Sequence, residues 1–339
     1  MKAALLDGYN SPWEVREVPT PEPGQGEVLV EVAGAGACHS DLSVMEGKFP
    51  IIDEFPMILG HENAGRVAAL GPGVEGLELG EPVAVFGAWG CGICSYCTSG
   101  LEHMCDESRW VGHGPPGGYA EYLLVPARRH LEPIGGLDPV EAACLTDAGL
   151  TPYRAVRRAL PRLVPGSLAV AIGIGGLGHM GLQYLKVLST ARVVAVDTSS
   201  DARGLAARLG ADVVLDPGEV DVVEAVRDVG NGEGADVVLD FVGNDATLAV
   251  AKQVVKRQSL IVIVGLGLGT LPYSFLDFPA EVDLYTAYWG SRDELSQVIT
   301  LAREGRVTPV VERHPLDSIN EVFTRLEEGK VRGRAVLIP

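Results

Sequence analysis

Four cysteines lie in one short stretch of the chain, GCGICSYCTSGLEHMC at residues 90–105. Four thiolates can complete a tetrahedral shell around zinc and leave no position for a substrate, as they do in structural zinc sites. The stretch therefore indicates a structural zinc lobe over residues 90–106. A redox dithiol, or a zinc ribbon that binds a partner protein, is the alternative. The four cysteines are Cys91, Cys94, Cys97 and Cys105.

Two smaller clusters upstream contain residue types that suit a different kind of zinc site. A thiolate, an imidazole and a third ligand that leave one position open to water or substrate describe a catalytic zinc centre. Each cluster alone is a weak signal, because a buried cysteine often packs as a small apolar residue and a single histidine is often a satisfied core residue. The clusters are CHSD, with Cys38, His39, Ser40 and Asp41, and GHE, with Gly60, His61 and Glu62.

The stretch GIGGLG at residues 173–178 has the G-x-G-x-x-G spacing of a dinucleotide-binding turn. It follows an expected strand and precedes an expected helix, and Asp197 ends the next strand, which is the context that this motif requires. A pyrophosphate would lie at the helix N-terminus. Asp197 would bind the adenosine ribose and repel a 2′-phosphate, which favours NAD over NADP. A glycine-rich turn without a ligand, and a solvated carboxylate at Asp197, are the alternatives. The residues expected at the cofactor are Gly173, Gly175, Gly176, Leu177, Gly178 and Asp197.

The elements that must position these residues change in type along the chain. Strands separated by Gly/Pro turns, as in residues 26–38 and 65–87, predict a partly open β-barrel. From Thr151, which we expect to cap a helix, Val/Ile/Leu-rich strands alternate with helices, and this predicts a doubly wound parallel sheet of the α/β class. The six expected strands cover residues 167–173, 191–197, 211–216, 235–243, 259–265 and 282–288.

Length and composition restrict the function. The 339 residues suffice for two domains, and 47% hydrophobic with 21% charged residues fits a globular protein. A formal net charge of −18 repels nucleic acid and anionic membranes, so we expect neither as a partner. The N-terminus lacks the apolar stretch of a signal peptide, and the apolar run at 260–269 is too short to span a bilayer. We therefore expect a cytoplasmic protein.

Taken together, these motifs resemble those of the zinc-dependent medium-chain alcohol dehydrogenases, particularly the bacterial secondary-alcohol members. The resemblance implies a GroES-like catalytic domain formed by residues 1–149 and 290–339, with an NAD-binding Rossmann domain at 150–289 inserted between them. It also implies a structural zinc in the four-cysteine lobe. It runs nearly end to end and rests on GACHSDL, LGHENAGRV, GCGICSYCTSGLEHMC, LTDAGLTPYRAV, GIGGLGHMG, YWGSRDEL and GRAVLIP.

The same resemblance implies a catalytic zinc held by Cys38, His61 and Asp147, the aspartate of TDAG. Cys144 is a softer and chemically plausible donor, but it lies in the apolar run AACL, where a thiol can pack as a small hydrophobe. Zinc would act as a Lewis acid toward the alcohol oxygen. Ser40 would pass the alcohol proton toward the nicotinamide ribose.

Further roles follow from matching positions in the family. Asp41 would orient His61, and Glu62 would lie beside the metal. His39 and Arg334 would lie near the cofactor pyrophosphate; a solvated surface arginine is the alternative for Arg334. One position departs from the pattern: Ser43 occupies a place where several relatives end the proton relay with a histidine, so Ser43, water or His39 must serve. Aromatic residues expected near the substrate, together with Ser43, are Phe49, Trp89, Trp110 and Trp289.

The predicted activity is reversible hydride transfer between NAD(H) and an alcohol or ketone. The aromatic residues favour an apolar or aryl secondary alcohol as the substrate. A polyol or amino-alcohol dehydrogenase of the same superfamily is the second interpretation. A non-catalytic zinc-lobe interaction protein is the third, and the intact CHSD and GHE clusters argue against it. We expect two zinc ions per chain and a homo-oligomer, with a tetramer favoured over a dimer.

Overall fold

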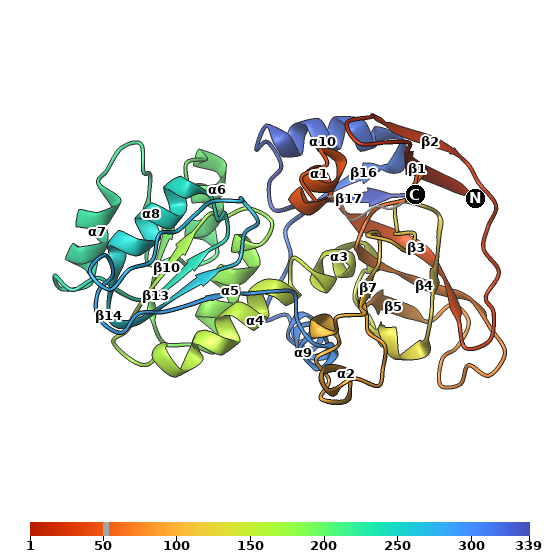
Figure 1. Cartoon of the computed structure of the whole chain (residues 1–339), viewed down its shortest axis with the longest axis horizontal. Coiled ribbons are helices and arrows are strands. Elements are labelled where there is room, and N and C mark those ends of the chain that lie inside the picture. The colour runs from red at the N-terminus through yellow and green to blue at the C-terminus, as the bar shows by residue number, and fades with distance from the viewer. Residues whose placement is uncertain (50–53) are drawn as a thin grey trace. The chain divides into compact units, whose positions relative to one another are not determined.

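The computed structural model describes residues 1–49 and 54–339. These residues divide into two compact units, shown with the whole chain in Figure 1. The first unit consists of Met1–Leu150 and Gly290–Pro339, and the second of Thr151–Trp289. Among the described residues, no helix is long and apolar enough to cross a bilayer.

The first unit is built on a seven-stranded sheet that combines strands from residues 28–133 with two strands from the C-terminal segment (Figure 1). The C-terminal strand pairs with an early strand through Val336 opposite Gly36 and Leu337 opposite Ala35. The described strands do not close into a barrel, in agreement with the partly open barrel expected from the sequence. The sheet order is β16 (Val311–Pro315), β17 (Arg334–Ile338), β3 (Val28–Gly36), β4 (Glu62–Leu70), β5 (Pro82–Val85) and β9 (Leu131–Pro133), with β8 (Tyr122–Val125) paired to β3.

Aromatic packing connects the C-terminal segment to the core of the first unit. The Trp13 ring lies 5.5 Å from that of Tyr119 and 5.3 Å from that of Phe323. Burial of such rings stabilises the packing of the C-terminal segment on this unit. The other elements of the unit are β1 (Lys2–Leu6), β2 (Trp13–Glu17), β6 (Ala88–Trp89), β7 (Arg109–Trp110), α1 (His39–Met45), α2 (Ser95–Thr98), η1 (Glu102–Met104), η2 (Arg128–His130), α3 (Pro139–Ala143), η3 (Cys144–Thr146), α9 (Arg292–Arg303), η5 (Leu316–Ser318) and α10 (Ile319–Glu327).

The second unit contains a six-stranded sheet in which every neighbouring pair is parallel. Its order, β12-β11-β10-β13-β14-β15, is that of a doubly wound dinucleotide-binding fold. The predicted fold class is therefore confirmed. The strands are β10 (Leu168–Ile172), β11 (Arg192–Val196), β12 (Val213–Leu215), β13 (Ala235–Asp240), β14 (Val255–Ile263) and β15 (Asp283–Thr286), and the helices are η4 (Leu160–Arg162), α5 (Gly178–Leu188), α6 (Ser200–Arg208), α7 (Val222–Val229) and α8 (Asp245–Val254).

Two boundaries differ from those expected. The helix that we expected Thr151 to cap is α4 (Leu150–Ala159), so Thr151 lies inside its first turn. Strand β14 begins at Val255 rather than near residue 259, directly after α8. Its pairing with β13 shifts register after Ala235, and Gln258 has a φ of 55°, so this part of the strand lacks the regular pattern that a sequence can indicate.

Candidate active site and metal centres

Three predicted ligands, Cys38, His61 and Asp147, come together in the first unit. The Oδ2 atom of Asp147 lies 4.0 Å from Cys38 Sγ and 3.5 Å from His61 Nε2. All three residues are buried, and Glu62 contributes a fourth possible ligand atom to the same group. The sequence brings none of these segments together; the sheet does so by placing the ends of β3, β4 and η3 side by side.

The donor set and its spacing fit a zinc ion. Tetrahedral zinc with bonds of 2.0–2.3 Å separates an imidazole nitrogen from a carboxylate oxygen by about 3.3 Å and a thiolate from that oxygen by about 3.5 Å. The observed separations of 3.5 and 4.0 Å need only a small contraction to reach those values. One thiolate, one imidazole and one carboxylate leave room for a fourth, exchangeable ligand, as in a catalytic centre.

The rejected alternative ligand, Cys144, lies apart from this group. Its thiol is buried and donates a hydrogen bond to the carbonyl of Glu141 at 3.0 Å. Burial raises the pKa of the Cys144 thiol well above its usual range, which opposes formation of the thiolate that a metal needs. Asp147 rather than Cys144 therefore lies with Cys38 and His61, and its role as the third zinc ligand stays a prediction.

Local structure explains the CHSD spacing. Cys38 is the N-cap of α1, and the Asp41 carboxylate, three residues later, accepts a hydrogen bond from the Cys38 backbone N–H at 3.1 Å. This is the geometry of a capping box, which fixes the first turn of a helix. The same carboxylate is fully buried and lies 3.2 Å from Nδ1 of His61, so it holds the His61 ring with Nε2 toward the metal ligands.

Two residues that the sequence analysis missed also face Asp41. The Tyr119 hydroxyl donates to Asp41 Oδ2 at 2.8 Å, and His113 Nε2 lies 3.8 Å from Oδ1. Burial acts to raise the pKa of Asp41, but the neighbouring His61 and His113 rings outweigh it and hold that pKa below its usual range. For His61, burial acts to lower the pKa and the Asp41 carboxylate raises it well above the usual value.

The Arg334 side chain lies beside the predicted ligand group, where its partners are carboxylates. Its guanidinium is buried and forms a two-pronged ion pair with Glu62, with Nε 3.0 Å from Oε2. It also lies 3.7 Å from Asp147 Oδ2. Burial raises the pKa of Glu62 to about 7, although the Arg334 guanidinium acts to lower it. In this structure Arg334 therefore neutralises carboxylates behind the ligand group, and its contact with a pyrophosphate stays a prediction.

The remaining predicted residues of α1 are arranged on its first two turns. The Cys38 thiol lies 3.6 Å from Ser40 Oγ, which places the Ser40 hydroxyl beside the ligand group. Ser43 is half-buried and follows Ser40 by three residues, so the two hydroxyls share one face of the helix. His39 is exposed. The chain therefore presents a Ser40–Ser43 pair, with Ser43 at the position that several relatives fill with a histidine.

The aromatic residues predicted for the substrate pocket have different surroundings. Trp89 is buried in the core of the first unit, and its indole N–H donates to the Phe86 carbonyl at 2.9 Å. Phe49 packs against the same core, and Trp110 is half-buried. Trp289 is buried and is the last residue of the second unit. Their role as a substrate pocket stays a prediction.

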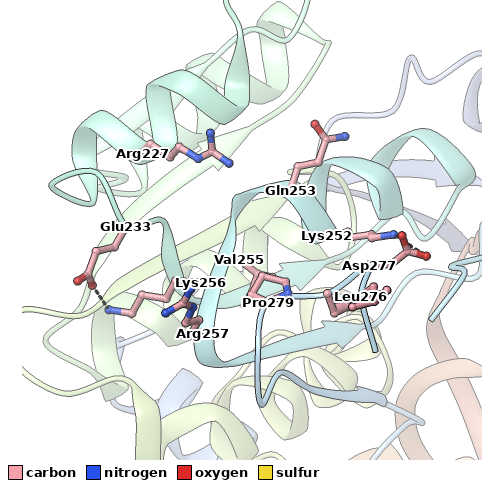
Figure 2. A pocket seen from close by; sticks show the side chains of 11 residues that line it. Arg227, Glu233, Lys252, Gln253, Val255, Lys256, Arg257, Leu276, Asp277 and Pro279 are labelled. Carbon is pink, nitrogen blue, oxygen red and sulfur yellow. Dashed lines mark hydrogen bonds and ion pairs between the residues drawn. The ribbon is translucent and has the colours of Figure 1, made fainter. Parts of the chain in front are cut away.

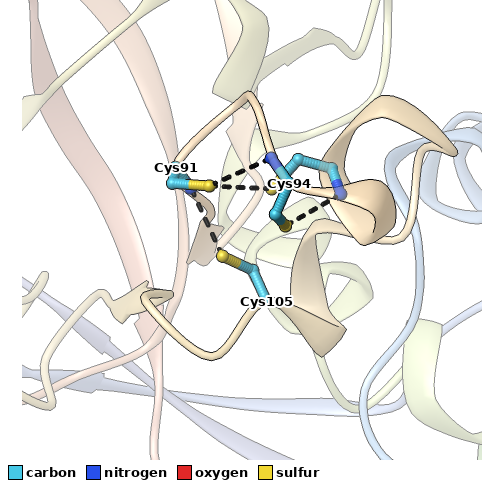
Figure 3. Close-up of side chains that lie close together, drawn as sticks. Cys91, Cys94 and Cys105 are labelled. Carbon is cyan, nitrogen blue, oxygen red and sulfur yellow. Dashed lines mark hydrogen bonds between the residues drawn. The ribbon is translucent and has the colours of Figure 1, made fainter.

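The four-cysteine lobe also fits zinc. All four are free thiols, and in Figure 3 Cys91, Cys94 and Cys105 point toward one another. Cys91 Sγ lies 3.9 Å from Cys97 Sγ, close to the spacing of about 3.8 Å for thiolates on tetrahedral zinc. Backbone N–H groups of Ile93 and Cys94 lower the pKa of Cys91 to about 7, which favours its thiolate. The four sulfurs form one group of possible metal ligands.

The fingerprint turn of the second unit has room for a cofactor. Gly173 has a φ of 84°, and a Cβ atom on Gly178 would lie 1.8 Å from the Gly173 carbonyl oxygen, so both positions require glycine. A Cβ atom on Gly175 would meet nothing within 4 Å, which leaves space for a pyrophosphate. The Asp197 carboxylate accepts hydrogen bonds from the backbone N–H groups of Ile174 at 2.6 Å and Ser199 at 2.8 Å. These bonds hold the predicted ribose-binding acid beside the turn.

A pocket of about 440 Å³ in the second unit is distinct from that turn (Figure 2). It is lined by the end of α8 and by the beginning of β14, whereas dinucleotides bind at the carboxyl ends of parallel strands. Its lysines face acids: Lys256 lies 3.3 Å from Glu233, and Lys252 lies 3.9 Å from Asp277. The pocket is therefore not part of the predicted cofactor site.

Comparisons with known proteins match the two parts of the chain to two family descriptions. The chain matches the family described as "Alcohol dehydrogenase GroES-like domain" over residues 24–135 and that described as "Zinc-binding dehydrogenase" over residues 176–304. It is 38% identical to an NAD-dependent alcohol dehydrogenase of Sulfurisphaera tokodaii, with 100% of both chains covered. The crystal structure of an alcohol dehydrogenase from Aeropyrum pernix superposes with a TM-score of 0.94 at 38% identity, again with 100% of both chains covered. The structure of acetophenone reductase from Geotrichum candidum in complex with NAD gives 0.88 at 33% identity, covering 100% of this chain and 97% of that one.

Proposed function

The chain belongs to the zinc-dependent medium-chain alcohol dehydrogenase family and is an NAD-dependent oxidoreductase acting on alcohols, and from this premise we propose that it interconverts apolar or aryl secondary alcohols and their ketones. The observation that carries the proposal is the buried group of Cys38, His61 and Asp147, with 3.5 Å between the His61 imidazole and the Asp147 carboxylate. We assign catalysis to the first unit and NAD binding to the second.

We propose that Cys38, His61 and Asp147 hold the catalytic zinc. Bound zinc supplies Lewis acidity toward the alcohol oxygen, which favours loss of the alcohol proton at neutral pH. Asp41 keeps Nε2 of His61 directed at the metal by engaging Nδ1. Glu62, which Arg334 neutralises, lies close enough to act as a transient further ligand.

Protons leave through the hydroxyls of α1 in this proposal. Ser40 accepts the alcohol proton because its Oγ lies 3.6 Å from Cys38 Sγ, beside the ligand group. Ser43, on the same face of the helix, or a water molecule carries the proton onward toward solvent. His39 is exposed at the start of α1 and offers a second route.

The preference for NAD over NADP is assigned to Asp197. Its carboxylate is held at the fingerprint turn by two backbone N–H groups, at the position from which it would repel a 2′-phosphate. An Asp197→Ser variant should shift the ratio of kcat/KM values for NADH and NADPH toward NADPH by on the order of tenfold, because it removes one like-charge contact. A wild-type preference for NADPH, or an unchanged ratio in the variant, would contradict the assignment.

The substrate class is supported by a relative and by the aromatic residues predicted for the substrate pocket. A 33%-identical protein is named acetophenone reductase, and acetophenone is an aryl ketone. Aromatic and apolar walls hold such substrates well. The test is a panel of simple and aryl ketones against sugar alcohols and amino alcohols, with NAD(H) fixed and zinc content measured on the same sample. Turnover confined to the polyols would favour the second interpretation, and no turnover with any carbonyl would favour a non-catalytic role.

We also propose a homo-oligomer, with a tetramer favoured. Strand β15 is an edge strand of the sheet, and unpaired edges invite pairing with another chain. Two large apolar side chains of the second unit, Phe275 and Leu276, are 96% and 91% exposed. Burying them against a second copy would remove apolar surface from water. Sedimentation equilibrium of the wild type measures the state, and a monomer would contradict the proposal.

A further inference from the structure

The residues Gly112–Tyr119 form a segment that reaches Asp41 from two sides. Asp41 is fully buried and connects directly to the predicted zinc ligand His61 through a 3.2 Å contact with Nδ1. His113 and Tyr119 both lie against the Asp41 carboxylate, which engages the Nδ1 side of the His61 ring. The segment is thus placed to control His61 indirectly.

The backbone of this segment is attached to the stretch that leads into His61. The N–H groups of Gly117, Gly118 and Tyr119 donate to the carbonyls of Ile58, Gly60 and Leu59 at 2.7, 2.9 and 3.1 Å. This ladder fixes the separation between the Tyr119 ring and the residue before His61. A Cβ atom added to Gly60 would lie 2.7 Å from that ring, so the contact is already close.

Tyr119 holds one oxygen of Asp41. Its hydroxyl is buried and lies 2.8 Å from Oδ2, closer than its other acceptor, the Gly36 carbonyl at 3.0 Å. Burial raises the pKa of Tyr119 well above its usual value, so the phenol keeps its proton and remains a donor. A buried hydrogen bond to a carboxylate is among the stronger kinds in proteins.

His113 covers the other oxygen and the face of His61. Its ring centroid lies 5.0 Å from that of His61 with the planes at 41°, and its Nε2 lies 3.8 Å from Asp41 Oδ1. Gly112 and Gly114, with φ values of 75° and 133°, give the chain the turn that places this ring. His113 therefore limits rotation of the His61 ring and adds a dipole or charge beside the carboxylate.

We propose that His113 and Tyr119 are positioning residues for the catalytic metal, acting through Asp41 to fix the tautomer and rotation of His61. The inference rests on the proposed function, because it requires zinc on Cys38, His61 and Asp147. Removal of a group that orients a metal-bound histidine typically lowers metal affinity by about 10–100-fold. Removing either side chain should therefore weaken zinc retention, and any loss of turnover should follow from the loss of zinc.

The experiment measures the rate of zinc release from the purified full-length enzyme to an excess of a chromogenic chelator. Wild type should release two zinc ions per chain in two phases, and Cys38→Ser should lack the phase that belongs to the catalytic site. In Tyr119→Phe and His113→Phe that phase should become about tenfold faster, while the phase of the four-cysteine lobe stays unchanged. Matched controls are Tyr184→Phe, a fully buried tyrosine of the second unit, and His314→Phe, a half-buried histidine of the first.

A second readout separates positioning from general loosening of the fold. Cobalt exchanged into the catalytic site reports its ligand geometry through its visible absorption bands, which should shift in both variants and stay fixed in both controls. In an Asp41→Asn background, Tyr119→Phe should add little further effect, because the two changes interrupt one path. Two results would overturn this inference while leaving the proposed function intact. One is an additive effect of Tyr119→Phe in the Asp41→Asn background, and the other is release rates and spectra of the single variants equal to those of wild type. A wild type with one zinc per chain and no catalytic phase would overturn the proposed function as well.

Discussion

The two predicted metal centres of the first unit are assembled in opposite ways. The sulfur ligands of the lobe are close in sequence, with Cys91 and Cys105 only 14 positions apart. The ligands of the catalytic group are far apart, with 109 positions between Cys38 and Asp147. The lobe offers four like donors, whereas the catalytic group offers one thiol, one imidazole and one carboxylate.

This contrast predicts a division of labour. A local group of four thiolates can gather around zinc while little else is folded. The free energy of zinc binding therefore contributes directly to the folding of the lobe. A dispersed group forms only when the sheet is complete, and its ligands are held by neighbours such as Asp41 and Arg334 whether or not metal is bound. Loss of metal should therefore cost structure in the lobe and activity at the dispersed group.

The largest effects come from exchanging one ligand in each centre. Cys38→Ser removes the thiolate of the catalytic group and should abolish turnover with only a small change in melting temperature. Cys94→Ser leaves an incomplete sulfur shell and should lower the melting temperature, by an amount set by the zinc binding energy that the lobe loses. Melting curves and steady-state rates on both variants check this pair. A Cys94→Ser enzyme that kept its melting point and lost turnover would reverse the roles of the two centres.

The next comparison decides the third catalytic ligand. Asp147→Ala should lose one zinc per chain and the activity, because it removes the oxygen that faces both Cys38 and His61. Cys144→Ala should keep both zinc ions and the activity, since its thiol bonds to a backbone carbonyl outside the group. Metal analysis and rates on the two variants provide the measurement. One zinc and no turnover in Cys144→Ala would show that the ligand had been misassigned.

The same contrast explains how much could be predicted from the sequence. Spacing alone indicates the lobe, since its ligands share one stretch, and the glycine fingerprint is equally local. Cys38, His61 and Asp147 needed a family resemblance, because the folded sheet rather than the chain brings them together. The doubly wound sheet followed from its alternating elements and is confirmed by the strand order.

Other contacts of the site could not be predicted, for the same physical reason. His113 and Tyr119 sit in WVGHGPPGGY, a Gly/Pro-rich stretch with no ligand pattern, and their partner Asp41 is 78 positions from Tyr119. The cofactor contact expected of Arg334 stays a prediction, but its ion pair with Glu62, 272 positions away, was not predicted. Pairs so distant in sequence leave no periodic signal, so only the folded chain shows them.

A smaller effect should follow from cutting the connection between the lobe and the C-terminal segment. Glu102 is buried, and its carboxylate lies 2.8 Å from Nε of Arg292, which follows the second unit in the chain. Glu102→Gln removes one charge of this partly buried pair and should lower the free energy of unfolding by about 2 kcal/mol. Urea denaturation measures this, with Glu107→Gln, an exposed acid directly after the lobe, as the control. Equal stability of the two variants would show that the pair does not anchor the lobe.

The smallest effect separates close packing from backbone strain within the lobe. A Cβ atom on Gly90 would lie 2.6 Å from Cys97 Sγ, so Gly90→Ala must displace a zinc ligand. A Cβ atom on Gly100 meets nothing within 4 Å, but this residue has a φ of 76°, so Gly100→Ala adds only the strain of a left-handed residue, about 1 kcal/mol. Both variants should therefore melt slightly earlier than wild type, but only Gly90→Ala should release lobe zinc faster, with the catalytic phase unchanged in both. The two substitutions add the same methyl group, so they differ only in where it lies. If Gly90→Ala and Gly100→Ala released lobe zinc at the same rate, the ligands would tolerate displacement and the lobe would not be a tightly closed site.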